Sequence, residues 1–273
     1  MPFSVVHGSP QDIWVPLTYG TTIYMGGMVS NDQSASTEGI EMMPQAAGVW
    51  NDTNYDIPFG VAIGNNNRRP LFNSTGKCEY ITSATSLAST TEFVGHGSSE
   101  YPFAREAFAK VSVVNACSVL RANLVDAAVT GAPAVGTVTT ASGSDGLDCT
   151  AGAASVANID SYSTIYFRTG ANAGTYRVLD STSATSHTWD TPCYAAVAVG
   201  DTVVVVNIRP VGLSKCQLLA TYMTAFDINE ACTSHYFGID VVRLNLAEQY
   251  KEYVEFMWNP VNWLPFAGRA SEA

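Results

Sequence analysis

The chain has 273 residues, of which 47% are hydrophobic and 14% charged, and its formal net charge at pH 7 is −11. This length predicts one or two domains with a buried core, and the scarcity of basic residues excludes direct binding to nucleic acid or to an anionic membrane surface. Because globular domains carry about a quarter of charged residues, the low charge predicts a subunit that covers much of its surface with other subunits; an ordinary secreted-type β protein is the alternative.

The first 64 residues predict an extended arm followed by a strand-rich region. Residues 1–20 have no helical period, and Trp14 and Leu17 are large apolar residues able to anchor such an arm. Glycines then recur beside short strand-like runs, as in small twisted barrels or sandwiches. The expected strands are 23–25, 27–29, 39–43, 48–50 and 58–63.

Three motifs in this region carry a resemblance to a known family. They are GTTIYMGGMV at 20–29, GIEMMPQAAG at 39–48 and PFGVAIG at 58–64. This order of glycines and small hydrophobic residues resembles the small β-barrel, or tulip-like, capsid cement (decoration) proteins of tailed bacteriophages. The resemblance covers about residues 18–64. It implies a protein that binds the outside of an icosahedral shell and locks neighbouring capsomers, although many such proteins are shorter than this chain.

The following region, to residue 129, gives mixed signals. Pro102 suits the first turn of a short helix over 102–110. The Val- and Ser-rich runs at 110–116 and 118–125 predict strands, while one long helix over 107–129 is the alternative.

Residues 130–212 predict an inserted β-module. β-Branched and aromatic runs alternate with Gly, Asn, Asp and Pro, and Tyr166, Tyr176 and Val178 are expected to share one sheet face. The Ala- and Gly-rich part at 130–157 is either a linker or the first strand with a long loop. The expected strands are 136–140, 164–169, 175–179, 184–189 and 202–208.

The chain then returns to the main body, with strands expected at 215–224, 237–246 and 250–258. The predicted fold is therefore mainly β, with few short helices. A small β-barrel or β-sandwich body is formed by residues 1–129 and 213–273, which carry extended terminal arms. The module at 130–212 is inserted into this body and faces outward.

The C-terminal tail is rich in aromatic residues and broken by prolines, which favours packing into a groove of the chain itself or of a neighbour. Large apolar groups without a regular period occur at both ends of the chain, and Trp is enriched among residues that anchor interfaces. The predicted interface residues are Trp14, Leu17, Trp258, Trp263 and Phe266.

The sequence predicts no catalytic residue, no metal site and no cofactor. It has no HExxH, GxSxG, Walker A or GxGxxG motif, and its local pairs of Glu are not a glycosidase signature. The four histidines are expected to be surface or capping residues, and the acidic alternation at 52–56 a polar turn rather than a calcium loop. The six cysteines form no CxxC pair, and residues 1–12 resemble no signal peptide, so we expect thiols.

These observations predict a virion structural protein that is not an enzyme. The expected role is a cement protein on the outer capsid surface, assembled in the host cytoplasm, with the major capsid protein and further copies of itself as partners. Local three-fold symmetry of a capsid suggests a homotrimer. The alternatives are a carbohydrate-binding or adhesion fibre module, with sugars stacking on Tyr162, Trp189 and Tyr194, and a small major capsid protein with a long spine helix at 107–129.

Overall fold

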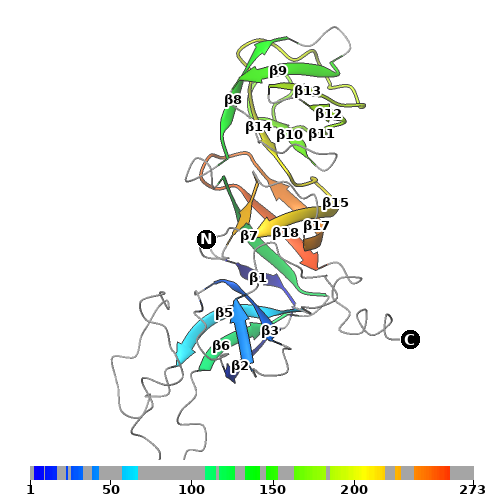
Figure 1. Cartoon of the computed structure of the whole chain (residues 1–273). Helices are drawn as coiled ribbons and strands as arrows, with labels where there is room; N and C mark the ends of the chain where they lie inside the picture. Colours follow the sequence, from blue (N-terminus) through cyan, green and yellow to red (C-terminus); the bar gives the residue numbers. More distant parts are fainter. Residues whose placement is uncertain are drawn as a thin grey trace, which may run out of the picture. The chain divides into compact units, whose positions relative to one another are not determined.

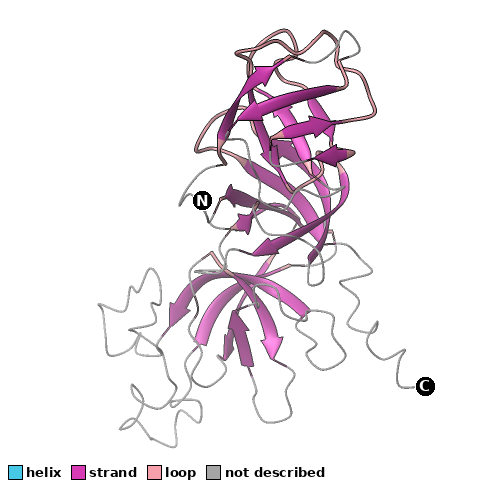
Figure 2. Cartoon of the chain, turned by 45° about the horizontal axis from the view of Figure 1, so that its top comes forward, coloured by secondary structure: helices cyan, strands magenta, loops and turns pink. Residues whose placement is uncertain are grey.

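The computed structural model describes residues 3–8, 10–16, 23, 26–32, 39–42, 57–66, 108–114, 117–126, 133–141, 146–152, 163–182, 185–218, 225–228 and 237–258. Every regular element within these ranges is a β-strand (Figures 1 and 2). The predicted mainly-β class is thus confirmed, and none of the expected short helices lies in the described part of the chain. The strands belong to two compact units: β1 to β6 lie in the first, and β7, from Arg121 onward, and the later strands lie in the second.

The first unit contains a five-stranded antiparallel sheet in the order β2-β6-β5-β3-β4. Its core consists of Ile23, Val29, Ile40, Ala62 and Val111, all buried. The short strand β1 is not part of this five-stranded sheet, and the buried Phe3 precedes it. The bounds are β1 Ser4–His7, β2 Gln11–Pro16, β3 Met28–Asp32, β4 Gly39–Met42, β5 Ile57–Asn66 and β6 Phe108–Val113.

One glycine of this sheet has a clear packing reason. At Gly60 in β5, an added Cβ would lie 2.5 Å from the carbonyl oxygen of Ser112 in the neighbouring strand β6. Real Cβ atoms do not approach backbone so closely, so the close contact of the two strands requires glycine here.

The second unit contains five strands whose pairings return to their starting point. The order is β7-β16-β15-β17-β18, and β18 also pairs with β7. Phe226, Phe256 and Trp258 are buried between these strands. The ring centroids of Phe226 and Phe256 lie 5.1 Å apart, and those of Phe256 and Trp258 lie 5.5 Å apart. Side chains along β7 alternate between half-buried and buried, as expected for a strand with one face on a core. The bounds are β7 Val119–Val125, β15 Gly212–Leu218, β16 Phe226–Asp227, β17 Phe237–Asn245 and β18 Tyr253–Trp258.

Between β7 and β15 the chain forms a seven-stranded sheet in the order β11-β10-β14-β8-β9-β13-β12. The two edge strands, β11 and β12, are separated by only two residues of the chain, Leu179 and Asp180. The sheet must therefore curl until its edges meet, which produces a barrel-like shape. The bounds are β8 Val135–Thr140, β9 Asp148–Gly152, β10 Thr164–Phe167, β11 Tyr176–Val178, β12 Ser181–Thr182, β13 Ser186–Thr188 and β14 Thr202–Val206.

The interior of this curled sheet is strongly apolar. The Val run of β14 is buried, and the rings of Phe167 and Trp189 meet edge to face at 5.7 Å. The indole N–H of Trp189 donates to the carbonyl of Gly146 at 2.9 Å, so the only polar atom of this side chain is satisfied inside the core. Tyr166 and Tyr176 lie opposite each other on β10 and β11, as the sequence predicted.

Most expected strands of residues 163–258 are present within a few residues of their predicted bounds. Three expectations elsewhere were wrong. Residues 108–110 belong to β6 and not to a helix, and β9 occupies part of the expected long loop after β8. Residues 11–16, expected in an extended arm, form β2 and pair with β6 in the chain's own sheet. The alternative of one helix over 107–129 is also wrong, because β6 and β7 lie there. The expected strand at 48–50 lies outside the described residues.

The expected boundaries of the body and the module do not coincide with the compact units. The strands of 212–258, which were expected to form one body with residues 1–129, belong to the same unit as the seven-stranded sheet. That residues 130–212 form an insertion which faces outward stays a prediction.

Candidate functional site: an exposed apolar loop and an adjacent groove

The loop between β13 and β14 presents apolar side chains to solvent. Residues 191–200 read TPCYAAVAVG and contain no charged side chain. Tyr194 is 91% exposed and Val199 64%, and Ala196 and Ala198 are also exposed. Isolated exposed apolar residues are common, but several in one uncharged loop form a surface suited to contact with another molecule.

A buried asparagine holds the centre of this loop. Asn172, 1% exposed, donates from Nδ2 to the carbonyl of Ala195 at 2.8 Å and accepts from the N–H of Ala195 at 3.0 Å. Both backbone groups of Ala195 are therefore bonded to one amide side chain. Because an amide carries both a donor and an acceptor, asparagine is suited to this position.

Four further hydrogen bonds fix the ends of the loop. The carboxylate of Asp201 accepts from the N–H of Ala198 at 3.1 Å, and the N–H of Cys193 donates to the carbonyl of Gly146 at 3.1 Å. The guanidinium of Arg177 donates to the carbonyls of Thr191 at 2.9 Å and Pro192 at 2.7 Å. The loop backbone is thus ordered before any partner binds, which reduces the entropy cost of binding.

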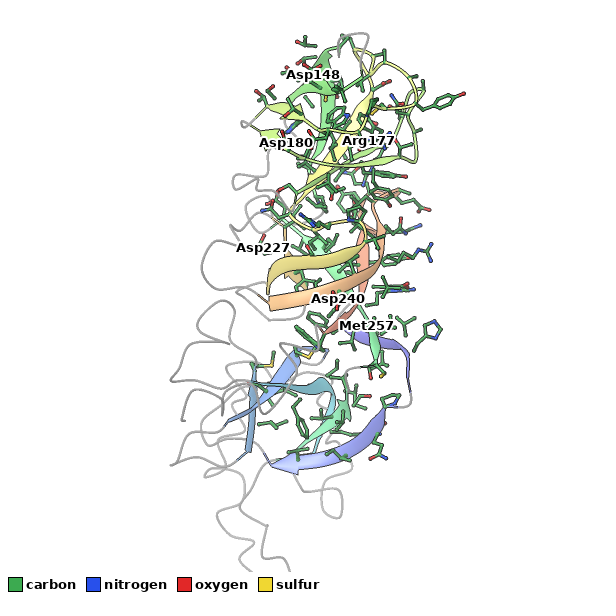
Figure 3. All side chains as sticks on the ribbon, turned by 90° about the vertical axis from the view of Figure 1, so that its right-hand side faces the viewer. Asp148, Arg177, Asp180, Asp227, Asp240 and Met257 are labelled. Atoms are coloured by element: carbon green, nitrogen blue, oxygen red, sulfur yellow. The ribbon has the colours of Figure 1, made fainter. Side chains whose placement is uncertain are left out.

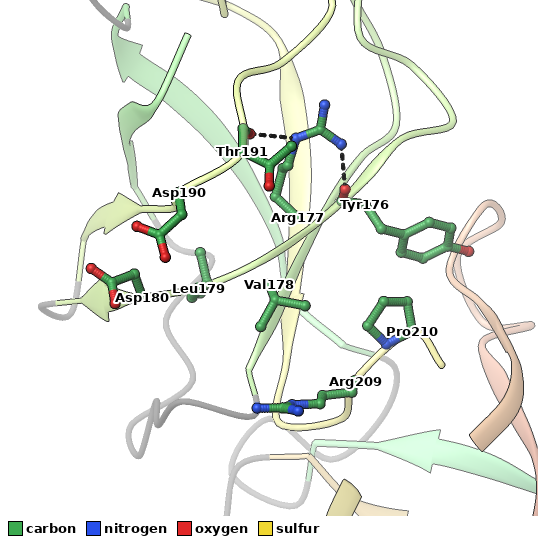
Figure 4. Close-up of a pocket in the computed structure, with 9 residues that line it drawn as sticks. All are labelled: Tyr176, Arg177, Val178, Leu179, Asp180, Asp190, Thr191, Arg209 and Pro210. Carbon is green, nitrogen blue, oxygen red and sulfur yellow. Dashed lines mark hydrogen bonds between the residues drawn. The ribbon is translucent and has the colours of Figure 1, made fainter. Parts of the chain in front are cut away.

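A groove of about 460 Å³ lies next to the start of this loop, along β11 (Figure 4). Its charged side chains are two arginines and two aspartates; Arg177 and Asp180 are also labelled on the curled sheet in Figure 3. The apolar part includes Val178, which is 39% exposed. The residues that line the groove are Tyr176, Arg177, Val178, Leu179, Asp180, Asp190, Thr191, Arg209 and Pro210.

Two titratable groups with shifted pKa values are buried on β13 and β9 of the curled sheet. Burial lowers the pKa of His187 from 6.5 to about 4, and neither ring nitrogen of this fully buried side chain has a hydrogen-bond partner. Opposite His187, on β9, burial raises the pKa of the Cys149 thiol to about 12, with Asp148 as the next cause. Both groups are therefore neutral at pH 7.

His187 corrects one prediction, because a surface or capping histidine was expected at this position. Its alternation with polar neighbours in the sequence gave no sign of burial. His7 is exposed as expected, and the other two histidines lie outside the described residues. Cys149 and Cys193 are free thiols; for the remaining cysteines the thiol state stays a prediction.

The structure describes two of the five predicted interface residues. Trp14 lies in β2 opposite Lys110 of β6. Trp258 is only 2% exposed and packs against Phe256, so it belongs to the chain's own core, the alternative that the sequence left open, and is not available to a partner. Leu17, Trp263 and Phe266 lie outside the described residues, as does the acidic run at 52–56.

Of the three aromatic residues expected to stack on sugars, the structure describes Trp189 and Tyr194. Trp189 is 2% exposed and serves the core, which overturns its expected role, whereas Tyr194 is freely accessible. Tyr162 lies outside the described residues. Sequence reasoning missed Asn172 and Arg177 as the supports of the loop, because their bonds run to backbone groups that are distant in the sequence.

Known proteins provide no assignment for this site. Within the described ranges, no three His, Cys, Asp or Glu side chains are placed to hold a metal ion, and no helix has the length and hydropathy of a membrane span. No family model matches the chain, and no curated protein or solved structure matches it either.

Proposed function

We propose that this protein is a virion structural subunit, a cement protein that binds the outer surface of a tailed-phage capsid and assembles with copies of itself. The observation that carries the proposal is the preordered, uncharged loop of residues 191–200 with Tyr194 almost fully exposed. Tyrosine in a rigid frame is a frequent anchor of protein interfaces. The resemblance of residues 18–64 to cement proteins supports the choice of partner.

The mechanism that we propose is mechanical. Stable protein interfaces bury about 1,200–2,000 Å², so rupture of a decorated shell must also break the contacts made by each attached subunit. Attachment of an oligomer raises the effective affinity without new kinds of contact. In this proposal the loop around Tyr194 contacts a neighbouring copy, in a homotrimer, and the oligomer binds the major capsid protein.

Two measurements test the proposal. Sedimentation of the purified protein with undecorated capsids tests binding to the shell, and light scattering coupled to size exclusion tests self-association. We expect the double variant Tyr194→Ser/Val199→Ser to remain folded, to lose self-association and to bind capsids more weakly. A matched control is Tyr250→Ser, since Tyr250 is also 77% exposed but lies between β17 and β18.

The outcomes are distinct. Failure of the folded wild-type protein to sediment with capsids contradicts the cement function. Unchanged self-association of the double variant contradicts the role of the loop. Of the alternatives, a small major capsid protein lacks its expected spine helix, because β6 and β7 occupy that segment.

A further inference from the structure

The groove along β11 has a mixed chemistry that the proposed function does not use. Its charged side chains are Arg177, Arg209, Asp180 and Asp190, two positive and two negative, so their formal charges cancel. Asp180 and Asp190 are both exposed, and Thr191 also lines the groove (Figure 4). The groove therefore offers strong acceptors and strong donors without a net charge.

The groove also has an apolar part and a volume suited to a small ligand. Val178 and Pro210 contribute aliphatic surface between the polar groups. Its volume of about 460 Å³ lies in the range of small-molecule sites. A ligand can thus place C–H groups on Val178 and Pro210 while its polar groups meet the carboxylates and guanidinium groups.

The walls of the groove are held in place from within the unit. Arg177 donates to the carbonyl of Tyr176 at 2.6 Å as well as to two carbonyls of the loop. The hydroxyl of Tyr176 donates to the carbonyl of Leu244 at 2.6 Å, and the N–H of Asp180 donates to the carbonyl of Thr188 at 2.9 Å. The polar groups are consequently positioned before a ligand arrives.

We infer that this groove binds a neutral carbohydrate, of the size of one or two sugar rings. Adjacent hydroxyl groups donate to a carboxylate and accept from a guanidinium, while the C–H face of a pyranose packs on aliphatic surface. A ligand of one charge sign would meet repelling as well as attracting groups here, so a single charge gains no net attraction from the groove. A neutral polyol fits both signs of charge at once.

This inference goes beyond the proposed function, because a cement protein needs no sugar. It adds a glycan-binding activity to the curled sheet and uses residues other than the aromatic set expected from the sequence. Among the described residues that line the groove, Tyr176 is the only aromatic one, and it is half-buried. We therefore expect dissociation constants in the millimolar range for single sugars, equivalent to about −4 kcal/mol.

The test is a two-dimensional NMR titration of the full chain with glucose, galactose, mannose and N-acetylglucosamine. At least one neutral sugar is expected to shift the amide signals of Val178, Asp180 and Thr191 in a saturable manner. Glucuronic acid is the charged control and is expected to bind more weakly than glucose.

The variant Asp180→Ala/Asp190→Ala removes both carboxylates from exposed positions, so the fold is expected to persist. It should weaken sugar binding about tenfold or more, since a hydrogen bond to a charged group contributes about 1.5–3 kcal/mol. Glu248→Gln is the control, because it removes an exposed carboxylate outside the groove.

The inference is overturned if no neutral sugar shifts these amides, if the double variant binds as well as the wild type, or if glucuronic acid binds more tightly. Tyr194→Ser/Val199→Ser is expected to keep sugar binding. Loss of self-association with retained sugar binding would thus show that the proposed function and the sugar site depend on different residues. Loss of sugar binding with retained self-association would show the same.

Discussion

The guanidinium of Arg168 donates to the carboxylate of Glu252 at 2.5 Å, and this ion pair joins the end of β10 to the start of β18. The two side chains are only 9% and 1% exposed. Arg168 also donates to the carbonyl of Leu246 at 2.8 Å. A buried, hydrogen-bonded pair thus connects the curled seven-stranded sheet to the sheet of β7, β16, β15, β17 and β18 within the second unit.

We expect Arg168→Ala to lower the free energy of unfolding by about 3–5 kcal/mol, because it leaves the charge of Glu252 buried without its partner. The matched control is Arg121→Ala. Arg121 pairs with Glu255, whose side chain is 11% exposed, but Arg121 itself is 34% exposed. Water can therefore replace part of the lost contact, and we expect a smaller loss of about 1–2 kcal/mol. Urea unfolding at pH 7 measures both.

The double variant Arg168→Met/Glu252→Met separates charge burial from packing. Apolar replacement of a buried ion pair is often neutral, so it should recover most of the stability lost in Arg168→Ala. Equal losses in Arg168→Ala and Arg121→Ala would show that the buried pair has no special role.

His187 predicts an acid-sensitive stability. Burial lowers its pKa to about 4 in the folded protein, below the value of 6.5 for an exposed histidine. Between these pH values the unfolded chain binds a proton that the folded chain excludes. The stability is therefore complete above pH 6.5 and decreases as the pH falls towards 4, by about 3 kcal/mol in total.

Urea unfolding at a series of pH values measures this loss. His187→Leu is expected to flatten the curve between pH 6.5 and pH 4, whatever its effect at neutral pH. His7→Gln is the control, since His7 is exposed. An unchanged pH dependence in His187→Leu would assign the acid sensitivity to other groups.

The sequence predicted the elements whose signals are local. Val203 to Val206 form an unbroken β-branched run between Asp201 and Asn207, and they are a buried central strand as expected. By contrast, β9 has the sequence DCTAG, in which neither propensity nor alternation indicates a strand. Its position is set by pairing with β8 and β13, which no local pattern contains.

The candidate site was less predictable than the fold. The uncharged run at 191–200 was visible in the sequence, but its exposure was not, because an apolar run usually indicates a core. Trp189 and Tyr194 show the difficulty: they are five positions apart, yet one is buried and the other almost fully exposed. The groove is lined by residues that are distant in the sequence, such as Asp180 and Arg209, and their placement requires the tertiary structure.

A pair of glycines tests how the loop is supported. Gly170 and Gly174 both have a left-handed backbone, with φ of 83° and 86°. An added Cβ at Gly170 would overlap the carboxylate of Asp201, whereas at Gly174 it would meet nothing within 4 Å. We expect Gly174→Ala to cost about 1–2 kcal/mol from backbone strain alone, and Gly170→Ala a further 1–3 kcal/mol, roughly, from the overlap.

Because Asp201 accepts from the N–H of Ala198, Gly170→Ala should also accelerate hydrogen exchange at Ala198, and Gly174→Ala should not. Thermal unfolding and amide exchange measure the two effects. Equal destabilisation by both substitutions would mean that Asp201 moves freely and does not fix the loop.

The last prediction concerns the C-terminal tail. Trp258 is already buried within its own unit and meets Phe256 edge to face at 5.5 Å. A chain truncated after Trp258 keeps this contact, so we expect it to melt within a few degrees of the full chain, whereas Trp258→Ala should lose about 3–5 kcal/mol by leaving a cavity. If the predicted interface residues Trp263 and Phe266 contact a partner, the truncated protein will fold but attach poorly to capsids in the sedimentation assay. A large drop in melting temperature on truncation would instead place the tail in the chain's own core, and normal attachment by a stable truncated protein would remove Trp263 and Phe266 from the interface.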